Sequence, residues 1–334
     1  MRNLYLSNLP APYRMDFYRS LYRDLACEIC FQDIRNGVSE IPVRRWTLGS
    51  LPALIKDCRP SVVIVPEFSA AAVLCLLLRK RYGYKVVSTC DDSLDMISGN
   101  DFGWKHRLAR RIVPRLLDEI VLHSPAVRDW YRSRFGKGLF MPILADERRI
   151  RPELERVLPL SERLLPGGKP VVAFVGRFVA LKNIPALIQA FRPLRDRARL
   201  VLIGDGPERA ELEALAPDAK FTGMLDGDEL LAWYDVIDIL VLPSTQEAYG
   251  AVTGEALMAG AKVVVSRKAG SSDLVREGEN GWIVDPHDVA RMTECMGRLL
   301  DEMPPGGPYV LRENRSPYRF ESSMQELIGK INSL

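Results

Sequence analysis

The sequence predicts an α/β protein of two Rossmann-like domains, each with a parallel sheet covered by helices. The chain has 334 residues, which suits two cores of ordinary size better than one. Short apolar runs rich in Val, Ile and Leu alternate with segments of helical period along the whole length, as in successive βαβ units. We expect the two domains to face each other across a ligand-binding cleft.

The first half contains five predicted strands, at 4–7, 27–32, 61–65, 85–89 and 119–123. Helices are expected between or after them, at 13–24, 69–81, 104–117 and 125–135. The stretch 144–170 is charged and flanked by proline, and it ends in Pro-Gly-Gly-Lys-Pro. We interpret it as an interdomain linker with room for one short helix.

The second half repeats the alternation, with strands expected at 171–175, 200–203, 220–222, 239–242 and 262–266. Its predicted helices are 184–195, 209–215, 228–236, 253–260 and 286–301, and an amphipathic segment, 319–334, ends the chain. These patterns predict an N-terminal domain over 1–165, with the linker from about 144, and a second domain over 166–318.

Composition narrows the function class. Apolar residues make up 47% and charged residues 27%, values typical of globular proteins. No apolar stretch approaches the ~18 residues of a membrane-spanning helix, and the N-terminus does not resemble a signal peptide, so we expect a cytoplasmic chain. The first 165 residues hold 27 Lys and Arg against 19 Asp and Glu, and the rest hold 19 against 24. A basic half suits an enzyme that meets an anionic surface on one side.

Cysteine and histidine give no sign of a metal or redox site. The six cysteines are scattered, and the Cys27-x-x-Cys30 pair lies in a predicted strand, whereas a redox pair opens a helix. We interpret the cysteines as reduced, small apolar residues. The three histidines are far apart in the sequence, so we expect no bound metal.

The segment 242–260 carries the strongest functional signal. A strand ends at Pro243, a polar loop with Gly250 follows, and a helix begins near Ala251. Free amides and the dipole at such a helix start favour a phosphate group. Glu247 in the loop and Glu255 inside the helix would be unfavourable beside phosphate unless they bind neutral groups such as sugar or ribose hydroxyls.

A second segment, 174–183, places two cations after a predicted strand. Arg177 follows Gly176 directly, and Lys182 comes just before the next helix. An arginine can donate to two phosphate oxygens at once, whereas a lysine acts as a point charge. The carboxyl ends of parallel strands lie at one edge of a sheet, so we expect both cations near the Glu247 loop.

Together these motifs resemble the GT-B glycosyltransferases of family GT4, the retaining group 1 glycosyltransferases. The resemblance covers about 171–286 closely and includes, in order, Gly176-Arg177, Lys182, Ile203-Gly-Asp-Gly-Pro207, Phe221-Thr-Gly-Met224, Asp238, Pro243-Ser244, Glu247, Glu255 and Asn280-Gly-Trp-Ile-Val-Asp285. The first half matches only in outline, through the opening Asn8-Leu-Pro-Ala-Pro-Tyr-Arg14 seen in bacterial members.

The resemblance implies a nucleotide-sugar site in the second domain. Arg177 and Lys182 would hold the diphosphate and stabilise it as it leaves, Glu255 would bind the ribose, and Glu247 would contact sugar hydroxyls and join the cations as a catalytic residue. The full implied donor set is Gly176, Arg177, Lys182, Gly223, Met224, Leu225, Glu247, Tyr249, Gly250, Ala251, Val252 and Glu255. The resemblance also implies that 319–334 forms a helix that packs back toward the first domain.

The acceptor side departs from the family pattern. Many members have a histidine after an N-terminal-domain strand, where this chain has Cys90-Asp91-Asp92. His123, after the next predicted strand, is the nearest alternative, or it is a strand-end histidine with a structural role. The acceptor-side candidates are Asp91, Asp92, His123, Tyr13 and Arg14.

The segment 104–117 is predicted to be a basic amphipathic helix, and its pattern has two interpretations. Four arginines, Arg107, Arg110, Arg111 and Arg115, fall on one side, and Leu108, Ile112, Val113 and Leu116 fall mostly opposite. The segment is either a core-packed helix with a solvated face or a surface that binds an anionic membrane.

We therefore expect a retaining, metal-independent glycosyltransferase without a cofactor, because the nucleotide-sugar is a co-substrate. Its acceptor would be a saccharide or a lipid-linked molecule in bacterial lipopolysaccharide, capsule or exopolysaccharide synthesis, and nucleic acid is not an expected partner. The enzyme would work in the cytoplasm, in part on the inner face of the plasma membrane. The alternatives are a nucleotide-sugar epimerase of the same fold and a non-catalytic sugar-nucleotide-binding subunit.

Overall fold

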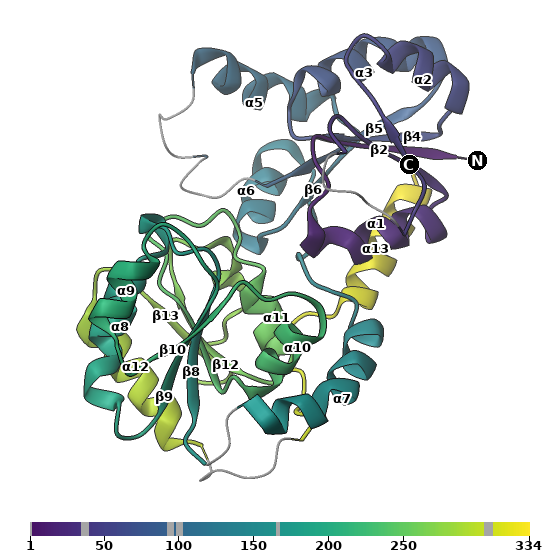
Figure 1. Ribbon diagram of the computed structural model, residues 1–334. Coiled ribbons are helices and arrows are strands. Elements are labelled where there is room, and N and C mark those ends of the chain that lie inside the picture. Colours follow the sequence, from purple (N-terminus) through teal and green to yellow (C-terminus); the bar gives the residue numbers. More distant parts are fainter. Residues whose placement is uncertain (1, 35–39, 92–96, 98–102, 165–167, 304–309) are drawn as a thin grey trace. The chain divides into compact units, whose positions relative to one another are not determined.

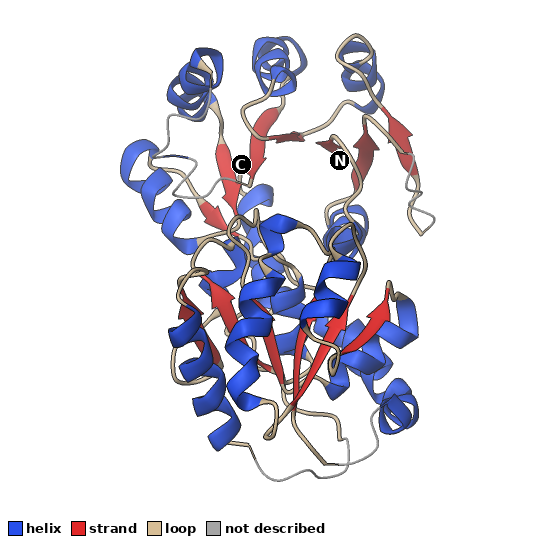
Figure 2. Cartoon of the chain, turned by 60° about the vertical axis from the view of Figure 1, so that its left-hand side comes forward, coloured by secondary structure: helices blue, strands red, loops and turns tan. Residues whose placement is uncertain are grey.

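The computed structural model of the chain describes residues 2–34, 40–91, 97, 103–164, 168–303 and 310–334. They form two compact units (Figure 1), one of Met1–Ala145 with Phe320–Leu334 and the other of Asp146–Arg319. Each unit contains one parallel sheet covered by helices (Figure 2), which confirms the predicted fold class.

The sheet of the first unit has seven strands in the order β3-β2-β1-β4-β5-β6-β7. The strands are β1 Asn3–Ser7, β2 Cys27–Phe31, β3 Val43–Arg45, β4 Val62–Pro66, β5 Lys85–Cys90, β6 Glu119–Leu122 and β7 Leu139–Phe140. The helices are η1 Pro12–Arg14, α1 Met15–Asp24, α2 Leu51–Cys58, α3 Ala70–Tyr82, α5 Trp104–Leu116, α6 Pro125–Phe135 and α13 Phe320–Asn332.

The sheet of the second unit has six strands in the order β10-β9-β8-β11-β12-β13. The strands are β8 Val171–Val175, β9 Arg199–Ile203, β10 Lys220–Gly223, β11 Ile239–Leu242, β12 Lys262–Ser266 and β13 Gly281–Val284. The helices are α7 Glu147–Leu164, η2 Ala180–Lys182, α8 Ile184–Phe191, η3 Arg192–Leu194, α9 Arg209–Leu215, α10 Gly227–Val236, α11 Val252–Met258, η4 Gly270–Leu274 and α12 Val289–Asp301.

In both sheets the first strand of the unit lies inside the sheet. β1 lies between β2 and β4, and β8 lies between β9 and β11. The chain order therefore reverses between β1 and β4 and again between β8 and β11. Loops that leave the carboxyl ends of two strands at such a reversal diverge, and ligands of doubly wound sheets bind there. In the second unit these are the loops that carry Arg177 and Glu247.

The central strands of both sheets are buried on both faces, which explains why they appear in the sequence as continuous apolar runs. Every residue of β4, β8 and β11 is buried, as expected for central strands of a parallel sheet. All six cysteines are free and buried, and burial raises the pKa of the Cys27 thiol to about 12. Both findings agree with the predicted role of the cysteines as small apolar residues.

Elements missing from the prediction are short or lie at sheet edges. β3 has three residues and β7 has two, and β3 is partly exposed along its length. Neither is long enough to show an alternation of apolar and polar residues. β13 and the eight-residue helix α2 were also not predicted.

The predicted linker is mainly a helix. α7 has 18 residues and two internal prolines, and it belongs to the second unit, so the boundary lies between Ala145 and Asp146. Leu154 and Val157 are buried, and the Ser161 hydroxyl donates to the α10 carbonyl of Ala232 over 3.3 Å. The buried residues of α7 form a stripe of helical period that packs on the second unit. The charged residues and prolines between them obscure this stripe in the sequence.

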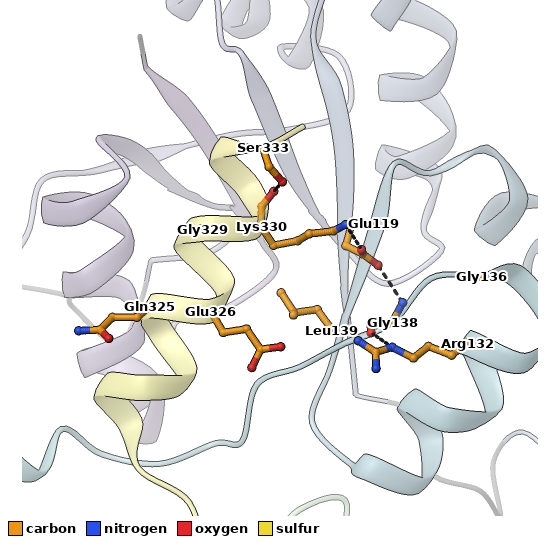
Figure 3. A pocket seen from close by; sticks show the side chains of 10 residues that line it. All are labelled: Glu119, Arg132, Gly136, Gly138, Leu139, Gln325, Glu326, Gly329, Lys330 and Ser333. Atoms are coloured by element: carbon orange, nitrogen blue, oxygen red, sulfur yellow. Dashed lines mark hydrogen bonds and ion pairs between the residues drawn. The ribbon is translucent and has the colours of Figure 1, made fainter.

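The final helix, α13, belongs to the first unit and lies beside α1 (Figure 1). Its buried residues are Phe320, Met324, Leu327 and Ile331, one stripe of helical period. Near its end, Lys330 Nζ lies 3.5 Å from Glu119 Oε2, at the start of β6. Figure 3 shows this ion pair beside a cavity of about 410 Å³. A buried carboxylate with a lysine partner thus helps to hold the end of the chain on the first unit.

We predict that Arg312 is a main stabiliser of the second unit. Its guanidinium donates to the carbonyls of Asp235 and Ile237, both over 2.7 Å, and lies 3.2 Å from Asp238 Oδ1. Arg312→Met would leave these partly buried groups unpaired and lower the free energy of unfolding by about 2–4 kcal/mol. Urea denaturation measures the loss, and Arg291→Met, which breaks an exposed i,i+3 pair with Glu294, should cost under about 0.5 kcal/mol. Equal effects of the two changes would contradict this role.

Candidate functional site

The loop after β8 is held by direct backbone contact with the loop after β9. The Gly176 amide donates to the Ile203 carbonyl over 2.9 Å, and the Phe178 amide donates to the Asp205 carbonyl over 2.8 Å. Gly204 has φ +139°, and a Cβ there would lie 1.9 Å from the Gly176 carbonyl oxygen. Only glycine allows this approach. The Gly-Asp-Gly-Pro turn between β9 and α9 therefore acts as a support for the β8 loop.

The two predicted cations differ in their surroundings. Arg177 is exposed, and its guanidinium has no ion pair with any described residue. Lys182 ends the short helix η2, and its ammonium forms an ion pair with Glu247 Oε2. These two side chains are only 19% and 14% exposed, so their interaction is shielded from water more than a surface pair is. The structure thus brings Lys182 and Glu247, 65 positions apart in the chain, into contact.

Asn183, which sequence reasoning did not single out, joins the two site loops. Its side-chain amide donates to the Pro243 carbonyl over 3.2 Å and to the Pro286 carbonyl over 2.8 Å. The residue has φ +53°, a conformation that asparagine tolerates better than most residues. Its position directly after Lys182 and before a helix is the sequence signal that could have identified it.

The Glu247 loop is fixed by its contact with the segment after β12. The Glu247 amide donates to the Lys268 carbonyl over 3.2 Å, and the Ser271 amide donates to the Tyr249 carbonyl over 2.7 Å. Gly250 has φ +88°, and a Cβ there would lie 2.5 Å from Leu242 Cδ2. The positive φ and the close approach to Leu242 together favour glycine at this turn. These backbone contacts hold the loop that presents Glu247.

Glu255 lies one turn inside α11, as predicted, and receives a hydrogen bond from the Tyr234 hydroxyl of α10. Burial raises the pKa of Glu255, and the Tyr234 hydrogen bond only partly opposes this rise. Tyr234 is a residue that the sequence did not reveal, because a tyrosine in an amphipathic helix is usually a core residue. The residue is half-buried, and its carboxylate has further oxygen lone pairs for a ligand hydroxyl.

The remaining predicted donor residues lie at the same edge of the sheet. Gly223, with φ +80°, ends β10, and Met224 after it is 68% exposed. Ala251 precedes α11, and Val252 is its first residue. The predicted donor set therefore lies at the end of β10, in the loops after β8, β10 and β11, and in the first turns of α11.

In the first unit, three of the acceptor-side candidates form a cluster. Arg14 Nη2 lies 2.5 Å from Asp91 Oδ1, and His123 Nε2 lies 3.1 Å from the same oxygen. Burial opposes the ionised form of Asp91, but contacts with His123 and Arg14 outweigh it and hold its pKa well below the usual range. Tyr13, next to Arg14, is 44% exposed. Asp92 lies outside the described residues.

His123 is 8% exposed, and its Nδ1 lies 2.6 Å from the Met141 carbonyl oxygen. With Nδ1–H donated to that carbonyl, Nε2 can attract the Asp91 carboxylate only when the ring is protonated. The other carboxylate oxygen of Asp91 is free of these two contacts, and its side chain is 51% exposed. Asp91 is thus the accessible member of the cluster, and Arg14 orients it.

Two further observations concern the described residues as a whole. They include no group of three or more His, Cys, Asp or Glu that could hold a metal ion. None of their helices is both long enough and apolar enough to cross a membrane.

Comparison with known sequences places the second unit in a family. Residues 169–302 match the family model described as glycosyl transferases group 1. A GDP-mannose-dependent α-(1-6)-phosphatidylinositol monomannoside mannosyltransferase of Mycolicibacterium smegmatis is 30% identical over 70% of this chain and 66% of its own length. A GDP-mannose-dependent α-mannosyltransferase of Corynebacterium glutamicum is 37% identical over 51% of this chain and 38% of its own. The chain spans between about a quarter and two thirds of the length of such curated relatives.

Solved structures resemble the whole chain. Anabaena HepE in complex with UDP has a TM-score of 0.78 at 18% identity, and the match covers 100% of both chains. The lipopolysaccharide outer core galactosyltransferase WaaB has a TM-score of 0.73 at 16% identity, covering 100% of this chain and 99% of its own. At these identities the likeness shows the fold.

We predict that Glu255 lowers the stability of the folded chain at neutral pH. A carboxyl group with a raised pKa in the folded state destabilises it as pH rises above the unfolded value, 4.5. Glu255→Gln removes this penalty while Tyr234 can still donate its hydrogen bond. The variant should be more stable than the parent in urea denaturation, and its advantage should grow from pH 5 to pH 8.

Glu294→Gln provides a control of opposite sign, because Arg291 lowers the pKa of that exposed carboxyl group. The free energy of unfolding of Glu294→Gln should fall slightly below that of the parent, and the difference should be larger at pH 8 than at pH 5. An advantage of Glu255→Gln that is the same at both pH values would contradict the assigned cause.

Proposed function

Because this chain belongs to the group 1 glycosyltransferases, of GT4 type and GT-B fold, we propose that it transfers a sugar from a nucleotide diphosphate to a saccharide or lipid-linked acceptor. The observation that carries the proposal is the ion pair between Lys182 and Glu247 at the carboxyl edge of the second sheet, with the exposed Arg177 in the loop that leads to Lys182.

The arrangement suits a diphosphate leaving group. Bond cleavage at the sugar leaves additional negative charge on the diphosphate, and fixed cations lower the barrier most when they act on charge that develops in the transition state. Arg177 can donate to two phosphate oxygens. Lys182, held by Glu247, supplies a second positive charge in a fixed position.

The carboxylates bind the neutral parts of the donor in this proposal. Glu247 is fixed by Lys182 and its backbone contacts, so its remaining lone pairs accept hydrogen bonds from hydroxyls of the transferred sugar. Glu255, oriented by Tyr234, accepts from the ribose. Gly223 to Leu225 contact the base. In the first unit, Asp91 accepts a hydrogen bond from the acceptor hydroxyl.

We further propose that the reaction retains the anomeric configuration and needs no metal, because Arg177 and Lys182 supply the charge that a divalent cation would supply at the diphosphate. Curated relatives use GDP-mannose, and related structures bind UDP and UDP-glucose, which supports a hexose donor with either base. Assembly of a bacterial surface polysaccharide or glycolipid is the setting that we propose.

The decisive experiment incubates the full chain with GDP- and UDP-hexoses and bacterial lipid-linked or saccharide acceptors, in EDTA and in Mn²⁺. Transfer with a retained anomeric configuration that is equal in both solutions supports the proposal. Conversion of one nucleotide-sugar into an epimer would replace it with the epimerase alternative. Donor binding in calorimetry without any turnover would indicate the non-catalytic subunit, and activity that requires Mn²⁺ would overturn metal independence.

We predict that Arg177→Ala lowers kcat/KM by about 10²–10³, as removal of one preorganised charge from a transition state typically does. The exposed Arg177 guanidinium forms no ion pair with any described residue, and its carbonyl contact with the Val179 amide is unaffected by the change, so the variant should not unfold the site. Arg267→Ala is the matched control, because Arg267 is an exposed cation that follows β12 at the same edge and lies 3.8 Å from Asp285. An Arg177 effect below threefold, or one matched by Arg267→Ala, would refute the assigned role.

We also propose that α5 binds an anionic membrane surface. Only part of the predicted apolar side packs inward: Val113 is 4% exposed, whereas Leu108, Ile112 and Leu116 are each 47–48% exposed and Trp104 is 65% exposed. These four residues recur every four positions and form one exposed apolar stripe. The arginines of the same helix supply positive charge, so its composition suits a lipid surface with negative headgroups.

The full chain should therefore sediment with phosphatidylglycerol vesicles at low salt and be released near 0.5 M NaCl, where the Debye length is about 4–5 Å. Ile112→Asp should weaken sedimentation at least tenfold. Val310→Asp, which changes a 59% exposed apolar residue of the second unit, should not. If both variants sediment like the parent, α5 has only a structural role.

A further inference from the structure

A second cavity, of about 650 Å³, lies at the opposite edge of the sheet of the second unit. Its lining includes Lys169, which precedes β8, and Arg199 and Lys220, which begin β9 and β10. The predicted donor residues follow the carboxyl ends of β8, β10 and β11, whereas this cavity lies at the amino ends. Its volume is within the range of small-molecule sites, about 300–1,000 Å³.

The floor of the cavity is apolar. Ile188 and Phe191, from the last turn of α8, are 3% and 7% exposed, and Leu200 of β9 is 5% exposed. Leu215, the last residue of α9, adds a half-buried side chain. A ligand with an apolar group would pack on this floor and remove the half-buried Leu215 side chain from water.

The cavity is also strongly basic. Five of its lining residues are cations, Lys169, Arg192, Arg195, Arg199 and Lys220, and the one acidic lining residue is Asp218. The sequence from residue 166 onward has an excess of acidic residues, 24 Asp and Glu against 19 Lys and Arg. Positive charge is therefore concentrated at this cavity, although the sequence around it has more acidic than basic residues.

The cations of the cavity differ in their use within the fold, since Lys220 donates to the Leu164 carbonyl over 3.3 Å and lies over the Trp233 ring. Arg197, which follows η3, forms an ion pair with Asp301 at 2.6 Å and does not line the cavity. Arg192 and Arg195 form no ion pair with any described residue. Like charges around one cavity repel each other, and a bound anion removes that repulsion.

We propose that this cavity binds an amphipathic organic phosphate, a molecule with a phosphate or diphosphate group joined to an apolar group. The cations would hold the phosphate at the rim, and the apolar group would cover Leu215 above the floor of Phe191 and Leu200. Neither an inorganic anion nor a neutral apolar molecule satisfies both parts. Because the cavity lies at the amino edge of the sheet, the ligand binds together with a nucleotide rather than in competition with it.

Calorimetry on the full chain tests the proposal with three probes: geranyl diphosphate, inorganic pyrophosphate and geraniol. Geranyl diphosphate should bind at least tenfold more tightly than either of the others, and saturating GDP or UDP should not displace it. Vesicles that contain phosphatidic acid distinguish the source of the ligand, since binding to them as well as to the free probe indicates a ligand taken from a bilayer.

The double variant Arg192→Gln/Arg195→Gln should weaken geranyl diphosphate at least tenfold, whereas Arg197→Gln should leave it within twofold. Equal affinity for pyrophosphate, displacement by GDP or UDP, or equal effects of the two variants would overturn the proposal. Circular dichroism checks that each variant is folded. Nucleotide binding is measured separately in the same samples. A failure to bind geranyl diphosphate would therefore overturn this proposal and leave the proposed transferase activity standing, and a failure to bind nucleotide would do the opposite.

Discussion

The candidate site depends on the close approach of two backbones, at Gly176 after β8 and Gly204 after β9. The space between them is too small for a Cβ atom, since one at Gly204 would lie 1.9 Å from the Gly176 carbonyl oxygen. The contact fixes the start of the loop that carries Arg177, and Asn183 fixes its end against the β11 loop. A short loop anchored at both ends can present a cation with little loss of conformational entropy on binding.

The ion pair between Lys182 and Glu247 joins two roles that the sequence assigned separately. The pair places the cation for the diphosphate and the carboxylate for the sugar in one hydrogen-bonded unit. Each charge lowers the cost of burying the other, so neither has to be fully solvated when a ligand covers the loop. A change at either residue therefore affects both, and for this reason the unpaired Arg177 gives the clearer measure of a single phosphate contact.

The sequence predicted the sheets and the loops of the site but not the contacts that orient the side chains. β4, β8 and β11 are fully buried and appear as continuous apolar runs, whereas β3 and β7 are too short to show a period. Sequence order placed Glu247 and Lys182 at the same edge, because parallel strands end together. Tyr234 and Asn183 could not be assigned in this way, since their partners lie 21 and 60 positions away and depend on side-chain packing. The acceptor-side cluster was foreseen as a set of residues, but the burial of His123 and the accessibility of Asp91 became evident only in three dimensions.

The basic cavity and the candidate donor site share one structural element. α8 begins directly after Asn183, at the end of the Arg177 loop, and its last residue, Phe191, forms part of the cavity floor. Five of the eight residues of α8 are buried, so the helix is packed along its length and can move only as a unit with its neighbours. A ligand that packs against Phe191 and a nucleotide that contacts Lys182 therefore act on opposite ends of the same short helix. Any preference of either ligand for one position of α8 must appear as a reciprocal change in the affinity of the other. Titration of a nucleotide at increasing geranyl diphosphate measures this coupling directly, and an unchanged nucleotide affinity would mean that the helix has the same position in both complexes.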